Sequence, residues 1–333
     1  MMKNKAVKKG KKKKILLIIL SVCLGILLIS GASMYFYLNG MLGKINYKPI
    51  TSKTSSSSGT SGTGDTLVSS KDVYNILLVG SDTRTTSTSN SRSDSMILLS
   101  INNKTKKTIM TSFMRDIYIP IPGHGSNRLN AAYSLGGISL LEQTIQNNFN
   151  VKIDRYVSVD FYDFINIIDK LGGINISVKD DEVKVLNEYI NEINKLKGLP
   201  DGNGFLKKGG DDLLLSGKQA LAYSRIRYVG NADFERTERQ RTVLTKVIAK
   251  LKKQNIVQLS SVLSMLLPDI TTDFTRNELM NVVMHALTYT GYSSEQYRVP
   301  IDGSYHGIYI DKMDVLSIDF DQNKQALKTK ING

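Results

Sequence analysis

Apolar and polar positions alternate in strand-like and helix-like patterns from residue 73 to the end of the chain. Short apolar runs rich in β-branched residues predict strands at 73–80, 95–102, 107–114, 154–160, 174–178 and 295–302. A period of three to four predicts helices at 139–149, 161–173, 183–197, 217–228, 234–253, 256–267 and 276–290. This alternation of strands and helices predicts an α/β fold, a three-layer α/β/α sandwich around a mixed sheet.

The pattern is different before residue 73. Residues 15–38 contain 24 positions without a charge, and a transmembrane helix needs only about 20. Eight lysines in residues 1–14 predict a cytoplasmic N-terminus and a single-pass anchor in the cell membrane. A cleaved signal peptide is the alternative, although the apolar run is longer than usual for one. Residues 39–72 are rich in Ser, Thr and Gly and predict a flexible linker, followed by an extracytoplasmic domain at 73–333.

The formal charge of +14 is the kind of value found in nucleic-acid-binding proteins. Residues 1–14 hold eight of the 44 basic residues, and the remainder carries 36 basic against 30 acidic residues. The charge is therefore mainly a property of the tail, and the predicted topology places the rest of the chain outside the cell. We expect no nucleic-acid partner. The only cysteine, Cys23, lies in the apolar run, so the exported domain has no disulfide and no cysteine nucleophile.

A polar loop between the first two predicted strands carries two aspartates and two arginines. Asp82 directly follows one strand and Asp94 directly precedes the next, so both lie at one edge of the sheet, where open α/β sheets bind ligands. Two carboxylates suit Mg²⁺, which is held by one or two carboxylates plus substrate phosphates, with Mn²⁺ as the alternative metal. Arg84 and Arg92 would hold the same phosphates. In the alternative interpretation, Asp and Ser only cap turns.

Arg115 and Asp116 follow the third predicted strand. If the first and third strands run parallel, Arg115 emerges beside Asp82. A structural salt bridge between Arg115 and its neighbour is the simpler interpretation. The pair therefore becomes informative only in combination with the other charged residues.

Five arginines lie between Arg225 and Arg241. In a helix starting near Phe234, with Asp233 as a candidate N-cap, Arg236 and Gln240 continue the apolar stripe and point inward. Glu238 and Arg241 point away from that stripe. Arg225 and Arg227 end the preceding helix, where cations also complement the helix dipole.

The chain lacks the motifs of common hydrolases. Its three histidines lie in unrelated contexts, and neither a GxSxG nor a P-loop pattern occurs. With no protein nucleophile in evidence, a second substrate has to supply the attacking atom. Paired carboxylates and many arginines then indicate phosphoryl transfer by positioning and charge neutralisation.

Seven motifs follow one another in the order and spacing of a known family. They are NILLVGSDTR (75–84), RSDSMILLSIN (92–102), MRDIYIPIPG (114–123), RLNAAYSLGG (128–137), DRYVSVDFYDFINIIDKLGGINISV (154–178), LSGKQALAYSRIRY (215–228) and DFERTERQR (233–241). Over about residues 74–253 the chain resembles the LytR-CpsA-Psr family. It departs from the family pattern in having Met114 where proline is usual.

The resemblance implies a membrane-anchored, Mg²⁺-dependent phosphotransferase. It implies transfer of an anionic glycopolymer, such as teichoic acid or capsular polysaccharide, from undecaprenyl pyrophosphate to peptidoglycan. A phosphodiester link results. Two alternatives stay open: a non-catalytic receptor for polyprenyl phosphates or anionic polymer that regulates envelope assembly, and a lipid pyrophosphatase.

The resemblance also implies roles for single residues. Asp82 and Asp94 match the metal ligands, and Asp116 and Asp233 are candidates for the general base. The positions matched to the pyrophosphate, or lying within its motifs, are Arg84, Arg92, Arg115, Arg128, Arg225, Arg227, Arg236, Arg239 and Gln240. For the carrier lipid the family implies an apolar tunnel between the sheet and the helices at 161–173 and 240–251, although both helices are equally compatible with an ordinary core.

Overall fold

The computed structural model describes residues 39–40, 42–50, 72–82, 92–227, 229, 232–253 and 256–333. The chain divides into two compact units, residues 1–44 and residues 45–333, and the elements below belong to the second. The predicted membrane span and Arg84 lie outside the described residues. Within the described ranges, every helix is too short or too polar to cross a lipid bilayer.

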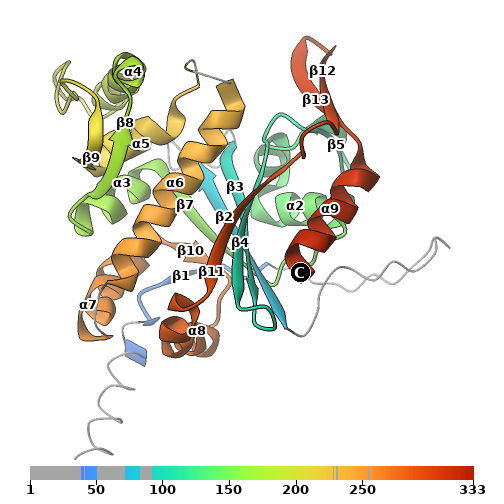
Figure 1. The fold of residues 1–333 in the computed structure, drawn as a ribbon, viewed down its shortest axis with the longest axis horizontal. Coiled ribbons are helices and arrows are strands. Elements are labelled where there is room, and N and C mark those ends of the chain that lie inside the picture. Colours follow the sequence, from blue (N-terminus) through green and yellow to red (C-terminus); the bar gives the residue numbers. More distant parts are fainter. Residues whose placement is uncertain are drawn as a thin grey trace, which may run out of the picture. The chain divides into compact units, whose positions relative to one another are not determined.

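A mixed sheet of seven strands forms the centre of the described part of the second unit (Figure 1). In spatial order the strands are β1 (Asn46–Tyr47), β10 (Thr271–Thr272), β7 (Arg155–Asp160), β2 (Val73–Ser81), β3 (Ser93–Asn102), β4 (Lys107–Phe113) and β11 (Ser293–Val299). β3 pairs antiparallel with both β2 and β4, so β2 and β4 run in the same direction. β7 and β11 extend the sheet by parallel pairing with β2 and β4. The predicted α/β fold with a mixed sheet is confirmed.

Helices lie against both faces of this sheet (Figure 1). α2 (Ala131–Phe149) and α9 (Phe320–Asn332) cover one face. The other face carries α3 (Phe161–Lys170), α5 (Gly217–Arg225), α6 (Ala232–Lys252) and α8 (Arg276–Thr290), with α7 (Ile256–Leu266) beside α3. α5 ends at Arg225, three residues before its predicted end.

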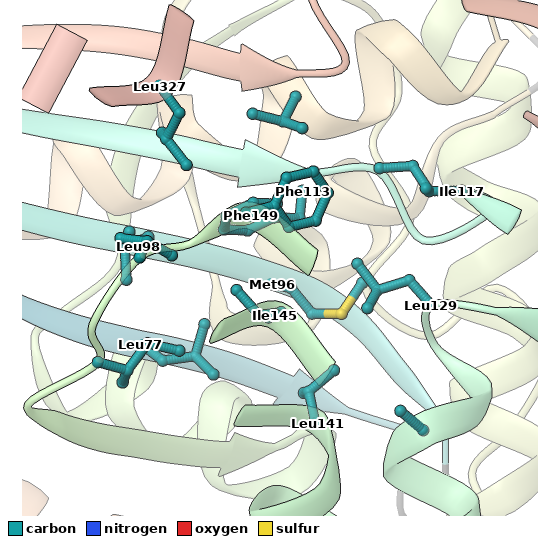
Figure 2. Close-up of a cluster of buried hydrophobic side chains, with 14 of the residues drawn as sticks. Leu77, Met96, Leu98, Phe113, Ile117, Leu129, Leu141, Ile145, Phe149 and Leu327 are labelled. Atoms are coloured by element: carbon teal, nitrogen blue, oxygen red, sulfur yellow. The ribbon is translucent and has the colours of Figure 1, made fainter. Parts of the chain in front are cut away.

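The main core lies between the sheet and α2. Side chains alternate across a strand, so Leu77 and Leu98 face α2, whereas Leu78 and Ile97 face the opposite helices. Figure 2 shows Leu77, Met96, Leu98 and Phe113 of the strands meeting Leu141, Ile145 and Phe149 of α2. Side chains fill the space between the sheet and α2. The cavity described below lies on the opposite face of the sheet.

Smaller elements extend the fold beyond the central sheet. β8 (Ile174–Val178), confirmed as a strand, pairs with β9 (Gly210–Leu215) in a separate sheet, with α4 (Asp180–Leu196) between them in sequence. Two further hairpins are β5 (Tyr118–Ile121) with β6 (Gly125–Arg128) and β12 (Tyr305–Ile310) with β13 (Met313–Ile318). The pattern of hydrophobic residues did not predict these hairpins or α9. β1 pairs with β10 although it lies within the segment predicted as a linker.

Candidate functional site

The ends of three neighbouring strands bring charged residues to one edge of the sheet. β2 and β3 pair up to Ser81 and Ser93, and the backbone N–H of Asp82 donates to the carbonyl of Arg92 at 3.0 Å. Asp82 and Asp94 therefore lie at the same edge. β4 runs parallel to β2 and ends two residues before Arg115, as the sequence predicts for a parallel arrangement.

Asp94 is held by one residue from the segment after β4 and two from α6. Its Oδ1 accepts a hydrogen bond from Arg115 NH1 at 2.6 Å, and Arg236 NH1 lies 3.8 Å from the same oxygen. Gln240 Nε2 donates to the backbone carbonyl of Asp94 at 3.3 Å. Arg236 and Gln240 thus point inward from α6, as the helical stripe predicts.

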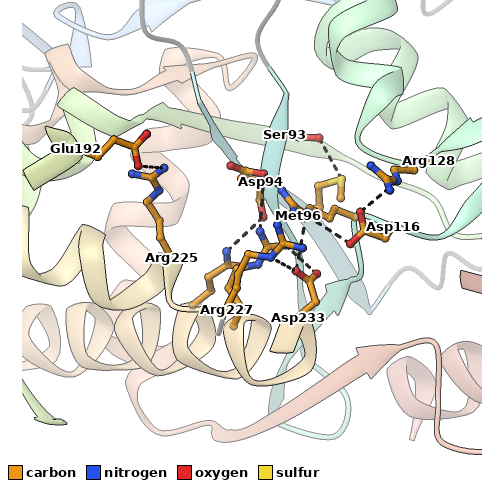
Figure 3. A network of polar contacts seen from close by, with 12 residues as sticks. Ser93, Asp94, Met96, Asp116, Arg128, Glu192, Arg225, Arg227 and Asp233 are labelled. Atoms are coloured by element: carbon orange, nitrogen blue, oxygen red, sulfur yellow. Dashed lines mark hydrogen bonds and ion pairs between the residues drawn. The ribbon is translucent and has the colours of Figure 1, made fainter. Parts of the chain in front are cut away.

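Asp233 is the second carboxylate of the cluster. Arg236 NH2 donates to its Oδ2 at 2.9 Å, and its Oδ1 lies 3.1 Å from Arg227 Nε and 3.8 Å from Arg115 Nε. Figure 3 shows Asp94 and Asp233 with the guanidinium groups between them. α6 begins at Ala232, so Asp233 lies inside the first turn of the helix and is not its N-cap. There its charge complements the helix dipole.

Burial gives these arginines different proton affinities. Arg236 is 3% exposed, and burial lowers its pKa, although Asp233 opposes the shift. For Arg115 the net shift is the opposite. Burial acts to lower its pKa, but the nearby carboxylates of Asp94, Asp116 and Asp233 outweigh burial, so the pKa is raised. Both guanidinium groups keep a buried Nε without a hydrogen-bond acceptor in the described part of the chain. The cluster therefore has donor capacity left for an anion.

An apolar cavity of about 510 Å³ continues from this cluster. Its polar end contains Asp82, Asp94, Arg115, Arg225, Arg227, Arg236 and Gln240. Its apolar walls come from the sheet, from Phe164, Ile167 and Ile168 of α3, and from Val243, Leu244, Val247 and Leu251 of α6. The predicted apolar tunnel between the sheet and these two helices is confirmed as a cavity of this structure.

Arg225 reaches the cavity from the end of α5. It pairs with Glu192 at 3.0 Å, and its guanidinium stacks on Phe161 and Tyr189. Gly217 permits the close packing of α5 on α3, since a Cβ there would lie 2.1 Å from the carbonyl oxygen of Ile165. The local sequence pattern did not predict that Tyr189 lines the cavity. Tyr189 belongs to α4, and only tertiary packing brings that helix to the site.

Three arginines matched to the family's motifs lie outside the cavity lining among the described residues. Arg239 is buried in ion pairs with Glu182 and Glu235, each at 2.8 Å. Arg128 Nε lies 3.6 Å from Asp116, and its NH2 donates to the carbonyl of Asp314. Arg92 is exposed at the start of β3.

Arg241 points away from the cavity, as the stripe predicts, but it is not a solvated residue. It is buried, and its guanidinium donates to Ser112 Oγ at 2.8 Å and to Gln296 Oε1 at 3.1 Å. The face of α6 opposite its apolar stripe is therefore buried at Arg241, because β4 and β11 pack against it.

The residues at the polar end fit a divalent cation only together with a ligand. Among the described residues, no group of three or more His, Cys, Asp and Glu side chains forms a metal site. Asp82 and Asp94 offer two carboxylates on one cavity edge, and Arg115 already occupies one oxygen of Asp94. This donor set suits Mg²⁺ when substrate phosphates complete the coordination.

Asp163, in the first turn of α3, carries an unfavourable charge. Burial raises its pKa to about 6, helped by Asp160 and Asp269 and opposed by Lys170. A pKa above the unfolded value means that the folded state gains stability as pH falls through 6 and loses it as pH rises. We therefore expect Asp163→Asn to raise the free energy of unfolding at pH 8.

The expected gain is about 1 kcal/mol, reduced for partial solvent exposure and for the favourable dipole interaction of a carboxylate in the first turn. Urea unfolding of both proteins at pH 8 and pH 4 measures it. The gain should be much smaller at pH 4, where the Asp163 carboxyl is largely protonated in the folded parent protein and about half protonated in the unfolded chain. An equal gain at the two pH values would show that the charge of Asp163 is not its cause.

Comparisons with known proteins agree with this geometry. The profile of the LytR_cpsA_psr family matches residues 33–331. Biofilm regulatory protein A of Streptococcus mutans is 34% identical over 250 residues, which are 72% of this chain and 57% of that protein. The polyisoprenyl-teichoic acid–peptidoglycan teichoic acid transferase TagU of Bacillus cereus is 30% identical over 299 residues, covering 88% and 89% of the two chains.

A solved structure of TagT bound to LI-WTA has a TM-score of 0.62 and 26% sequence identity, and the match covers 78% of this chain and 90% of that one. The family profile spans nearly all of the chain. The chain belongs to the LytR-CpsA-Psr family.

Proposed function

We propose that this protein transfers an anionic glycopolymer from a polyprenyl-pyrophosphate carrier to peptidoglycan. One observation carries the proposal: a cluster of arginines and aspartates, most of them half-buried, opens directly into an apolar cavity of about 510 Å³. A pyrophosphate with a long hydrocarbon tail has the same two-part character. The transferase name of the relative in Bacillus cereus and the ligand of TagT support the choice of substrate.

In this mechanism, an acceptor hydroxyl gives its proton to a carboxylate, for which Asp116 and Asp233 are the candidates, and attacks the sugar-proximal phosphorus. The bond from that phosphorus to the bridging oxygen breaks, a phosphodiester forms, and polyprenyl monophosphate leaves with the bridging oxygen. Arg115, Arg227 and Arg236 neutralise the charge that develops on the leaving phosphate. Asp233 keeps these three guanidinium groups together, and Asp116 lies 3.6 Å from Arg115 Nε.

Mg²⁺ or Mn²⁺ held by Asp82 and Asp94 would supply Lewis-acid stabilisation of the phosphate oxygens. The carboxylates also repel the pyrophosphate when no cation is present, so binding of the two is expected to be coupled. Arg225 extends the positive charge along the cavity, and its stacking on Phe161 and Tyr189 fixes its position.

We further propose that residues 15–38 anchor the chain in the cytoplasmic membrane with the second unit outside. The uncharged 24-residue run after eight lysines supports this topology. Such an anchor keeps the site near its lipid substrate. Digestion of the second unit by protease added to intact cells would support it, and complete protection would argue against it.

A transfer assay tests the function directly. Purified full-length protein receives a polyprenyl-pyrophosphate-linked glycan and peptidoglycan fragments, and polyprenyl monophosphate release is measured. Release only with acceptor indicates transfer, and equal release without acceptor indicates a pyrophosphatase. Binding without any release indicates a receptor, which needs the arginines and the cavity but not Asp82 and Asp94.

The apolar part of the cavity should select for the long tail. Val247 lies on the cavity wall formed by α6. We expect Val247→Trp to weaken binding of undecaprenyl pyrophosphate about 10-fold or more, since each CH₂ kept in water costs about 0.8 kcal/mol. Geranyl pyrophosphate, with its short tail, should bind nearly as before. Isothermal titration with both lipids measures the difference.

The matched control for this variant is Ala249→Trp. Ala249 lies on the exposed side of α6, so the same bulk is added to the same helix outside the cavity. Both lipids should bind this control as they bind the parent protein. Equal loss for the long and the short lipid in Val247→Trp would contradict a tail-binding cavity.

A further inference from the structure

A second cavity of about 440 Å³ lies on the other side of α6. It is lined by Phe234, Glu238 and Arg241 of α6 and by Tyr297, Arg298 and Asp302 of β11 and the loop after it. Arg236 and Glu238 lie two positions apart, about 200° around the helix axis, so they face different cavities. α6 therefore separates the two cavities. The proposed mechanism assigns no role to the second one.

Arg241 brings to this cavity a buried positive charge that has no salt bridge among the described residues. The side chain is 8% exposed, and its two hydrogen-bond acceptors, Ser112 Oγ and Gln296 Oε1, are neutral. Among the described residues, no carboxylate forms a salt bridge with it. Burial lowers the pKa of Arg241 to about 10, with Glu238 opposing and Arg298 adding to the shift. A buried cation without a direct salt bridge is costly, and an anionic ligand in contact with it would relieve that cost.

A stack of aromatic and guanidinium groups borders the cavity. The guanidinium of Arg298 lies 4.3 Å from the ring centroid of Phe234 and 5.9 Å from that of Tyr305. The two rings themselves are 5.1 Å apart. Such surfaces accept the apolar face of a sugar ring. Phe234 directly follows Asp233, whose carboxylate holds the arginines of the first cavity, so this stack adjoins the proposed transfer site.

The charges on the cavity wall are of both signs. Glu235, Glu238 and Asp302 line it together with Arg241 and Arg298. Asp302 is paired with Arg298 and Glu235 with Arg239, whereas Glu238 is exposed on the helix surface. Three carboxylates disfavour a polyanion such as the donor polymer. A ligand that carries both a carboxylate and an ammonium group matches this wall.

We propose that the second cavity binds the peptide-bearing sugar of the peptidoglycan acceptor, with Arg241 taking a carboxylate of the peptide and Glu238 an ammonium group. The inference rests on the proposed function, because transfer requires an acceptor that approaches the phosphate from outside the lipid cavity. In this arrangement α6 presents donor-binding residues on one side and acceptor-binding residues on the other.

Calorimetric titration tests this assignment without catalysis. The probe is a disaccharide-peptide with a free carboxylate and a free amine, added to the full-length protein in detergent micelles. We expect Arg241→Gln to raise its Kd about 10-fold or more, and Glu238→Gln to raise it several-fold. A probe whose carboxylates are amidated should bind the parent protein about as weakly as the unmodified probe binds Arg241→Gln. Undecaprenyl pyrophosphate should bind all three proteins equally.

The exposed Arg276→Gln on α8 is the control and should bind the probe like the parent protein. If Arg241→Gln unfolds, Glu238→Gln decides, because its side chain is exposed and the substitution leaves the fold intact. Probe binding unchanged in Glu238→Gln and in a folded Arg241→Gln, or absent in the parent protein at millimolar concentration, overturns the assignment. Stronger binding of the free anionic polymer than of the probe overturns it too.

The titration also separates this inference from the function on which it rests. Probe binding that depends on Arg241, in a protein that transfers nothing, supports the cavity and contradicts the transferase. Transfer that proceeds while the probe ignores both substitutions supports the transferase and contradicts the cavity assignment.

Discussion

Replacing Asp82 and Asp94 together by alanine is expected to lower the transfer rate about 1,000-fold or more, equivalent to about 4 kcal/mol of transition-state stabilisation. Both carboxylates lie on the edge of the cavity next to the arginine cluster, and in the proposed mechanism they hold the cation. Their loss removes that cation but leaves the positive charge of Arg115, Arg225, Arg227 and Arg236. Lipid pyrophosphate should therefore bind the double variant at least as tightly as the parent protein.

Release of polyprenyl monophosphate at increasing Mg²⁺ measures the first effect, and calorimetric titration with the lipid measures the second. The double variant Asp201→Ala, Asp211→Ala removes two exposed carboxylates elsewhere and should transfer at the parental rate. Transfer that is unchanged by loss of Asp82 and Asp94 would exclude them as metal ligands. It would also leave the receptor and the transferase to be separated by product analysis alone.

Removal of the Arg236 guanidinium is the substitution expected to weaken donor binding most. Arg236 is 3% exposed and lies between Asp94 and Asp233. Arg236→Ala deletes charge-assisted hydrogen bonds to the pyrophosphate and leaves two carboxylates without this partner. We expect the Kd of undecaprenyl pyrophosphate to rise about 100-fold or more. Arg236→Lys should raise this Kd less than Arg236→Ala does, since lysine keeps the charge but not the planar guanidinium fork.

Thermal unfolding must accompany these titrations, because burial makes Arg236 a structural residue as well. The lysine variant keeps the charge and has the better prospect of keeping the fold. Arg276→Ala on the surface of α8 is the matched control and should leave donor binding unchanged. Donor affinity within a factor of about two in a folded Arg236→Lys and Arg236→Ala would show that this guanidinium does not contact the phosphates.

Some features of the fold and of the site could be predicted from the local sequence pattern, and others could not. The strand patterns of 73–80, 95–102 and 107–114 predicted β2, β3 and β4, because each is a short apolar run between turn residues. The stripe of Arg236 and Gln240 on α6 was predictable from helical periodicity alone. Both conclusions depend on local rules, which act within a few residues.

Other features depend on contacts between distant segments. Arg239 and Arg236 stand three positions apart in one motif, yet Arg239 pairs with Glu182 of α4 and Arg236 lines the cavity. Arg241 faces away from the apolar stripe but is buried by β4 and β11, whose residues Ser112 and Gln296 lie 129 and 55 positions away in the sequence. No local pattern carries information about such partners.

The sequence by itself determined the class of fold, the meeting of Asp82 and Asp94 at one edge of the sheet, and the inward direction of Arg236 and Gln240 on α6. It could do so because periodicity and strand ends are properties of neighbouring residues. Only the tertiary structure decided which arginines share a site and which serve as structural ion pairs. It also created the second cavity, since Phe234 and Arg241 meet Arg298 and Tyr305 only when β11 and β12 pack beside α6. The chemistry of a buried charge depends on its neighbours in space, and those neighbours are set by the packing of the whole fold.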